Sequence, residues 1–159
     1  MKQKTQILFV CSGNTCRSPM AAGYFNSLIS KSGLEHVKVL SAGTSASNGA
    51  PASGNSIEVM KDLGIDISAH KSSPVTLPLL QKSDIIVVMT RIHKARIEKI
   101  CNDAIHKTHL LLEFAGKKDH DIGDPIGGSL ADYRKCFEQM KPALDNLFLE
   151  ILSNKPGTK

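Results

Sequence analysis

Short apolar segments alternate along this chain with segments whose apolar residues recur at the spacing of an α-helix. The segments with the composition of buried strands are residues 5–10, 37–40, 85–89 and 108–112. The segments with helical spacing are residues 18–32, 51–63, 91–101 and 133–151. This alternation predicts an α/β fold with an open, mainly parallel four-stranded sheet and helices on both faces.

The chain of 159 residues has the length of one domain with one substantial core. We find no internal repeat and no linker, so the sequence predicts a single domain over residues 1–159. The last helix, with apolar residues from Tyr133 to Ile151, contains Pro142. Because proline removes a helical hydrogen bond, we expect a kink or a break near this residue.

Composition argues against several classes of function. No apolar run approaches the roughly 20 residues of a membrane-spanning helix, and the polar residues 1–6 do not resemble a signal peptide. We therefore expect a cytoplasmic protein without a membrane partner. With no Trp, two Tyr and five Phe, the chain offers no aromatic platform for nucleic-acid bases, so we expect no nucleic-acid partner. The net charge of +5 favours anionic partners such as phosphate groups.

The loop of residues 11–18 (CSGNTCRS) follows the first strand, and open parallel sheets bind ligands at the carboxyl ends of their strands. Gly13 and Asn14 adopt a positive φ angle most easily, so successive N–H groups of the loop can point inward as an anion-binding nest. The following helix adds its own free N–H groups. Arg17 closes the ring and can hold two phosphate oxygens with its planar guanidinium.

A cysteine at the start of such a cradle is a candidate nucleophile. The nest stabilises the Cys11 thiolate, which attacks phosphorus in line while Arg17 binds the equatorial oxygens. Ser18 can donate a hydrogen bond to the sulfur and make it a better leaving group in the second step. The alternative is a buried cysteine in a tight turn. The preceding strand, the Gly-Asn pair and the Ser-Pro start of a helix favour the nucleophile.

Residues 10–21 (VCSGNTCRSPMA) resemble the signature of the low-molecular-weight protein tyrosine phosphatases. The resemblance continues at residues 41–44 (SAGT), residues 68–72 (SAHKS) and Asp124-Pro125. It implies the same fold, with Cys11 as the nucleophile and Arg17 as the phosphate clamp. The implied phosphate-binding loop comprises Ser12, Gly13, Asn14, Thr15, Cys16 and Ser18. The implied network that supports the loop comprises Asn14, Ser18, Ser41 and His70.

The reaction needs a proton for the leaving group and then a base for the attacking water, and one carboxyl group can be both. The candidates near the C-terminal loop are Asp119, Asp121, Asp124 and Asp132. By composition alone Asp124-Pro125 is an ordinary turn; the resemblance assigns the general acid to Asp124. The run Asp119-His120-Asp121 suggests a metal site or a solvated loop, and we favour the loop. We expect no metal and no organic cofactor.

The substrate is expected to be a phosphorylated protein or peptide, with inorganic phosphate as a product. Thr15 stands where tyrosine-specific relatives usually have an apolar residue, and Ile126 and Gly127 stand where they have aromatic residues. A phosphotyrosine ring prefers apolar, aromatic walls. The threonine and the segment at residues 124–129 (DPIGGS) resemble the protein-arginine phosphatases of the same family. We therefore favour phosphoarginine over phosphotyrosine.

Three other functions remain as alternatives. Arsenate reductases of this fold use a closely spaced cysteine pair after the loop, whereas Cys101 and Cys136 lie far apart in the sequence. A phosphocysteine carrier of sugar transport needs neither Arg17 nor a general acid. A binding module would recognise phosphoproteins without hydrolysing them.

The remaining thiol of the loop has two interpretations. Cys16 can form a reversible disulfide with Cys11 that protects the nucleophile from over-oxidation, or it can be a small apolar thiol that packs under the loop. The sequence assigns no role to the histidines at positions 36, 93, 106, 109 and 120.

Overall fold

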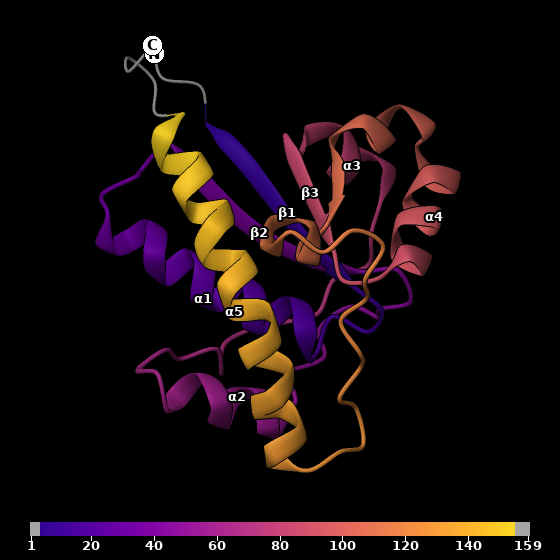
Figure 1. Ribbon diagram of the computed structural model, residues 1–159. Helices are drawn as coiled ribbons and strands as arrows, with labels where there is room; N and C mark the ends of the chain where they lie inside the picture. The colour runs from indigo at the N-terminus through magenta and orange to yellow at the C-terminus, as the bar shows by residue number, and fades with distance from the viewer. Residues whose placement is uncertain (1–3, 155–159) are drawn as a thin grey trace.

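A computed structural model describes residues 4–154; residues 1–3 and 155–159, which belong to the predicted domain, lie outside the described part. One sheet of four parallel strands has the order β2-β1-β3-β4 (Figure 1). The strands are β1 (Thr5–Cys11), β2 (Val37–Gly43), β3 (Ile85–Val88) and β4 (Thr108–Leu110). The predicted open parallel sheet is confirmed.

Helices cover both faces of the sheet, as predicted. Helices α1 (Arg17–Lys31) and α5 (Leu130–Ser153) lie on one side, and α3 (Leu77–Lys82) and α4 (Arg91–Ile100) lie on the other (Figure 1). A hydrophobic core lies on each face of the sheet. Strand β1 contributes side chains to both cores because successive side chains of a strand point to opposite faces. Ile7 and Phe9 pack towards α1 and α5, whereas Leu8 and Val10 pack towards α3 and α4. Helix α2 (Gly54–Lys61) packs against α1 and α5.

Several elements differ from the prediction in length. Strand β2 continues to Gly43 because it pairs in register with all of β1. Helix α2 begins at Gly54, since Ser53 caps it and Pro51 instead bridges to Lys71. Strand β4 ends at Leu110, where a 3-10 helix follows. The short helix α3 was not predicted, because six residues are too few to establish a periodic pattern.

Of the kink or break predicted near Pro142, the break is wrong, because α5 runs from Leu130 to Ser153 through the proline. Pro142 faces solvent, and so does Glu138, whose carbonyl loses its helical donor. Water can hydrate that carbonyl, so the helix continues. None of the helices within residues 4–154 is both long and apolar enough to span a membrane.

The strand order reverses direction at β1, whose last residue is Cys11. From β1 the chain moves to β2 on one side, and from β2 it returns across β1 to β3 on the other side. Parallel sheets bind ligands where the connections diverge in this way. The loop between β1 and α1 lies at this point.

Candidate active site

The loop that joins β1 to α1 has its carbonyl groups turned outward. The carbonyls of Cys11, Ser12 and Thr15 each accept a backbone hydrogen bond of 2.9 Å, from Thr44, Ser45 and Ser53 respectively. The N–H groups of residues 13–18 donate to no group within residues 4–154. A loop that bonds its carbonyls outward presents its N–H groups on the inner side, and α1 adds the positive end of its dipole. This arrangement attracts an anion.

Asn14 fixes the shape of the loop. It has a φ angle of 57° and is fully buried, whereas Gly13 is not in the left-handed region. Its amide nitrogen donates to Ser18 Oγ at 2.7 Å and to Ser41 Oγ at 3.0 Å. The backbone carbonyl oxygen of Asn14 lies 2.7 Å from His70 Nε2. The structure thus brings together the four residues to which the resemblance assigned loop support.

Gly43 lets β2 approach this loop closely. A Cβ atom at this position would collide with the carbonyl oxygen of Ser12 and would lie 2.9 Å from the nitrogen of Asn14. Both obstacles are backbone atoms, which cannot rotate away as a side chain can. The SAGT segment therefore needs glycine at its third position.

The sulfur of Cys11 lies inside the loop, 2.9 Å from Ser18 Oγ. Because Ser18 Oγ already accepts a hydrogen bond from Asn14, its own proton is available to the sulfur. A hydroxyl donor stabilises a thiolate and lowers the barrier to its departure.

Arg17 joins the loop to the segment that contains Asp124. Its Nη1 donates to the carbonyl of Ile122 at 2.7 Å, and its Nη2 lies 3.4 Å from Asp124 Oδ2. The guanidinium is buried, and its Nε has no hydrogen-bond partner among the described residues. A buried N–H group without an acceptor is costly unless a ligand satisfies it.

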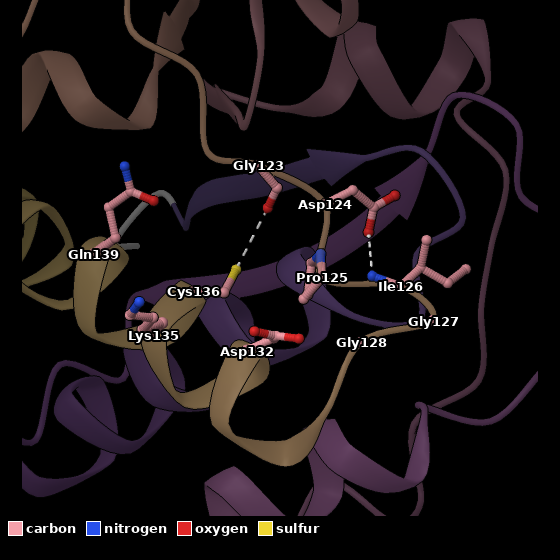
Figure 2. A pocket seen from close by; sticks show the side chains of 10 residues that line it. All are labelled: Gly123, Asp124, Pro125, Ile126, Gly127, Gly128, Asp132, Lys135, Cys136 and Gln139. Atoms are coloured by element: carbon pink, nitrogen blue, oxygen red, sulfur yellow. Dashed lines mark hydrogen bonds between the residues drawn. The ribbon is translucent and has the colours of Figure 1, made fainter.

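Hydrogen bonds within the segment of residues 124–129 (DPIGGS) stabilise its turn. Asp124 Oδ1 accepts the N–H of Ile126 at 3.1 Å (Figure 2). The N–H of Gly128 donates to the Pro125 carbonyl at 2.8 Å. Gly127 has a φ angle of 79°. A Cβ atom on Gly128 would lie 2.6 Å from the carboxylate of Asp132, which accepts the N–H of Ser129, the N-cap of α5. The two glycines therefore allow the turn to join the helix directly.

A cavity of about 510 Å³ lies between this segment and the first turns of α5. Figure 2 shows Cys136 reaching from α5 towards the carbonyl of Gly123, with Sγ 3.7 Å from that oxygen. Burial raises the pKa of the Cys136 thiol to about 12, so this cysteine stays protonated. Cys101 belongs to the core on the opposite face of the sheet. The sheet separates these two thiols, so they cannot act as a pair with each other.

Cys16 and Tyr133 contact each other beneath the loop, with 3.3 Å between Sγ and the phenol oxygen. Tyr133 is buried, and burial raises its pKa. Cys16 also contacts Ser53 at 3.7 Å. The sequence did not indicate this role for Tyr133, which appeared only as one apolar position of a helix.

His93 is a second residue of the site that the sequence did not indicate. Its Nε2 lies 2.8 Å from Ser12 Oγ, and its Nδ1 accepts the N–H of Thr90 at 3.2 Å. Burial, and then the nearby cation of Arg17, lower the pKa of His93 to about 4. The one available signal was the spacing of Thr90 and His93, which form a capping box at the start of α4.

The run Asp119-His120-Asp121 lies at the surface. Asp121 accepts hydrogen bonds from the backbone and side chain of Arg91, and His120 Nδ1 lies 2.6 Å from the carbonyl of Lys118. Within residues 4–154, no three acidic, histidine or cysteine side chains come close enough together to hold a metal ion.

Comparisons with known proteins agree with this geometry. The model of the family described as "Low molecular weight phosphotyrosine protein phosphatase" matches residues 6–156. A protein-arginine-phosphatase of Geobacillus stearothermophilus is 39% identical over 142 residues, which are 89% of this chain and 93% of that protein. A probable low molecular weight protein-tyrosine-phosphatase, EpsP of Ralstonia nicotianae, is 34% identical over 87% of this chain and 90% of its own.

A mutant of the YwlE arginine phosphatase with a phosphorylated active-site serine has a closely similar structure. Its TM-score is 0.89 at 33% identity, and the match covers 95% of this chain and 98% of that one. The chain belongs to the low molecular weight phosphotyrosine protein phosphatase family and is a cysteine-dependent phosphoprotein phosphatase.

Proposed function

We propose that the protein hydrolyses phosphoarginine in proteins, with Cys11 as the nucleophile, Arg17 as the phosphate clamp and Asp124 as the acid and base. One observation carries the proposal: the Cys11 sulfur lies within a loop whose N–H groups, together with the buried Nε of Arg17, lack acceptors among the described residues. A phosphoryl group supplies those acceptors. Its equatorial oxygens are also where the charge of the transition state is spread.

In the first step the thiolate of Cys11 attacks phosphorus, the S–P bond forms and the P–N bond to the guanidine breaks. Asp124 protonates the departing nitrogen. Its side chain is 39% exposed, so it can meet both the substrate and water. Electrostatic stabilisation comes from the loop N–H groups and Arg17, which need no rearrangement as charge develops.

In the second step a water molecule attacks the phosphocysteine, the S–P bond breaks and inorganic phosphate leaves. Asp124, now ionised, accepts the proton of the water. Ser18 donates to the sulfur as it departs, at the position where its hydroxyl already lies. The same carboxyl group thus serves in both steps.

The preference for phosphoarginine is supported by the lack of aromatic walls. Tyr133 is buried against Cys16, and Tyr24 is bonded to Asp145 on the α1–α5 side of the molecule. Neither is free to stack on a phosphotyrosine ring. The carboxyl group of Asp124 can form hydrogen bonds with the guanidine nitrogens of phosphoarginine before it protonates the departing one. The similarity to protein-arginine-phosphatases points the same way.

Phosphotyrosine is the second candidate, because Ile126 is 67% exposed beside Asp124 and offers an apolar surface. The relative from Ralstonia carries the name of a tyrosine phosphatase. The deciding experiment compares kcat/KM on phosphoarginine and phosphotyrosine peptides of matched sequence, with Cys11→Ser as the blank. A higher value for phosphoarginine supports the proposal, and a higher value for phosphotyrosine replaces it.

A further inference from the structure

Helix α4 begins beside the phosphate-binding loop, and the buried imidazole of His93 connects the two. Both ring nitrogens have partners. Nδ1 faces the N–H of Thr90 at 3.2 Å, and Nε2 faces the hydroxyl of Ser12 at 2.8 Å. His93 is 3% exposed, so water does not compete for either nitrogen.

The capping box determines which nitrogen of His93 carries the proton. A backbone N–H group can only donate, so Nδ1 must accept from Thr90. The proton of the neutral ring is therefore on Nε2, which donates to Ser12 Oγ. A second proton on Nδ1 would break the bond to Thr90.

The charged groups around His93 come from two other segments. Arg17 of α1 approaches as a cation, and Asp121 and Asp124 approach as anions from the segment before α5. Asp121 is already paired with Arg91. The ring remains neutral in this setting, because burial and Arg17 both oppose a further positive charge.

The hydroxyl of Ser12 contacts both His93 and the guanidinium of Arg17. A hydroxyl oxygen accepts two hydrogen bonds. The first comes from His93, and Nη2 of Arg17 provides a longer contact at 3.5 Å. The same Nη2 lies 3.4 Å from Asp124.

We infer that His93 is a positioning residue of the phosphatase reaction, which holds Arg17 in place through the hydroxyl of Ser12. The inference rests on the proposed role of Arg17 as the phosphate clamp. His93 does not touch the phosphoryl group. It fixes Ser12, and Ser12 keeps Nη2 of Arg17 directed between the loop and Asp124. Orientation at this level matters, because a misplaced clamp loses its contacts with the transition state.

A purely structural role for His93, as the cap of α4, is the competing explanation. The two ring nitrogens allow the two explanations to be tested separately, because Nδ1 contacts the cap residue Thr90 and Nε2 contacts Ser12. His93→Asn retains an acceptor at about the position of Nδ1 and loses the donor to Ser12. His93→Gln places an amide donor at about the position of Nε2 and loses the acceptor for Thr90. The cap explanation predicts that Asn is the better replacement, whereas a positioning role predicts that Gln is.

The test measures kcat and KM with p-nitrophenyl phosphate and the inhibition constant of inorganic phosphate. We expect His93→Asn to lower kcat/KM about tenfold and to weaken phosphate inhibition by a similar factor, as for the loss of one buried hydrogen bond. His93→Gln should stay within about threefold of the wild type. Thr90→Val, which loses the capping hydroxyl but keeps the backbone N–H, should lower the melting temperature without changing kcat.

Ser12→Ala removes the same link without altering the core. It should match His93→Asn, and the double variant should be no worse than either single variant, because coupled residues are not additive. Nitrogen-15 NMR of the imidazole should show the proton on Nε2. The inference is overturned if the Asn and Gln variants have equal activities, if Ser12→Ala retains wild-type phosphate inhibition, or if the proton is on Nδ1. Failure of the proposed substrate is seen separately, as hydrolysis of the aryl phosphate without hydrolysis of phosphoarginine peptides.

Discussion

The hydroxyl of Ser18 lies 2.9 Å from the sulfur of Cys11, which is buried in the loop of residues 11–18. Ser18→Ala removes this donor and one of the two acceptors of the Asn14 side-chain amide, which keeps its bond to Ser41. Because the sulfur must leave with a negative charge in the second step, we expect kcat to fall by about tenfold or more. Rapid mixing with an aryl phosphate should show a burst of phenol followed by a slower steady state. Equal rates for wild type and variant would contradict the role of Ser18.

Asp124→Asn should remove both the acid and the base. We expect kcat to fall by about 10² to 10⁴ with an alkyl phosphate, which needs a protonated leaving group. The loss should be smaller with p-nitrophenyl phosphate, whose leaving group needs no proton. Asp119→Asn is the matched control, because Asp119 is exposed with a φ angle of 56° that asparagine also tolerates. Equal losses for the two variants would show that Asp124 is not the acid.

Gly43→Ala should displace the phosphate-binding loop. The new methyl group would overlap the backbone of Ser12 and Asn14. We expect the free energy of unfolding to fall by about 1–3 kcal/mol, with loss of most activity. Gly54→Ala is the control, because a Cβ atom there has no neighbour within 4 Å and α2 gains an alanine. Urea denaturation and kcat measure the two effects, and a fully active Gly43→Ala would contradict this packing.

The pH dependence of stability should report on His93. Its pKa is about 4 in the folded protein and 6.5 in the unfolded chain, so the unfolded chain binds more protons between these values. Stability should therefore fall as pH decreases from 6.5 towards 4, by about 3 kcal/mol in total. His93→Gln cannot titrate and should lack this component. Urea denaturation of both proteins across that range measures the difference, and identical slopes would contradict a neutral buried imidazole.

Thr15→Ile should shift the substrate preference. Isoleucine removes a hydroxyl from the half-buried rim of the loop and adds apolar surface, which suits an aromatic ring better than a guanidinium. We expect the ratio of kcat/KM for phosphoarginine over phosphotyrosine peptides to fall. The fold and the aryl phosphatase activity should be retained, because the backbone of Thr15 is held by Ser53. An unchanged ratio would show that Thr15 does not select the substrate.

The sequence predicted the sheet and the position of the loop because these features follow from local patterns. It did not predict the contact between Arg17 and Asp124, which lie far apart in the chain. The apolar run of β1 and the Gly-Asn turn are both readable in a short window. The break at Pro142 did not follow, since the cost of proline depends on whether the lost hydrogen bond faces water, and exposure is a tertiary property.

The contacts of His93 and Tyr133 could not be predicted from the sequence because they also depend on the tertiary structure. Ser12 and His93 lie 81 residues apart, and Cys16 and Tyr133 lie 117 residues apart. The spacing of Thr90 and His93 marks the start of a helix, but it does not indicate that this histidine reaches the loop, and nothing near Tyr133 indicates its contact. Only the order of the strands brings α4 and α5 to the same edge of the sheet.

The outward carbonyls of the loop have a consequence for how such a site can change during evolution. Apart from the guanidinium of Arg17, the groups proposed to bind the anion are main-chain N–H groups, which every amino acid except proline has. The side chain of Thr15 can therefore be exchanged while the cradle keeps its charge and shape, provided that Asn14 and Gly43 hold the backbone. The side chain of Ser12 is more constrained, because it contacts His93 and Arg17. Substrate preference and phosphate chemistry are thereby encoded in different atoms of the same eight residues, so that one can drift while the other is preserved.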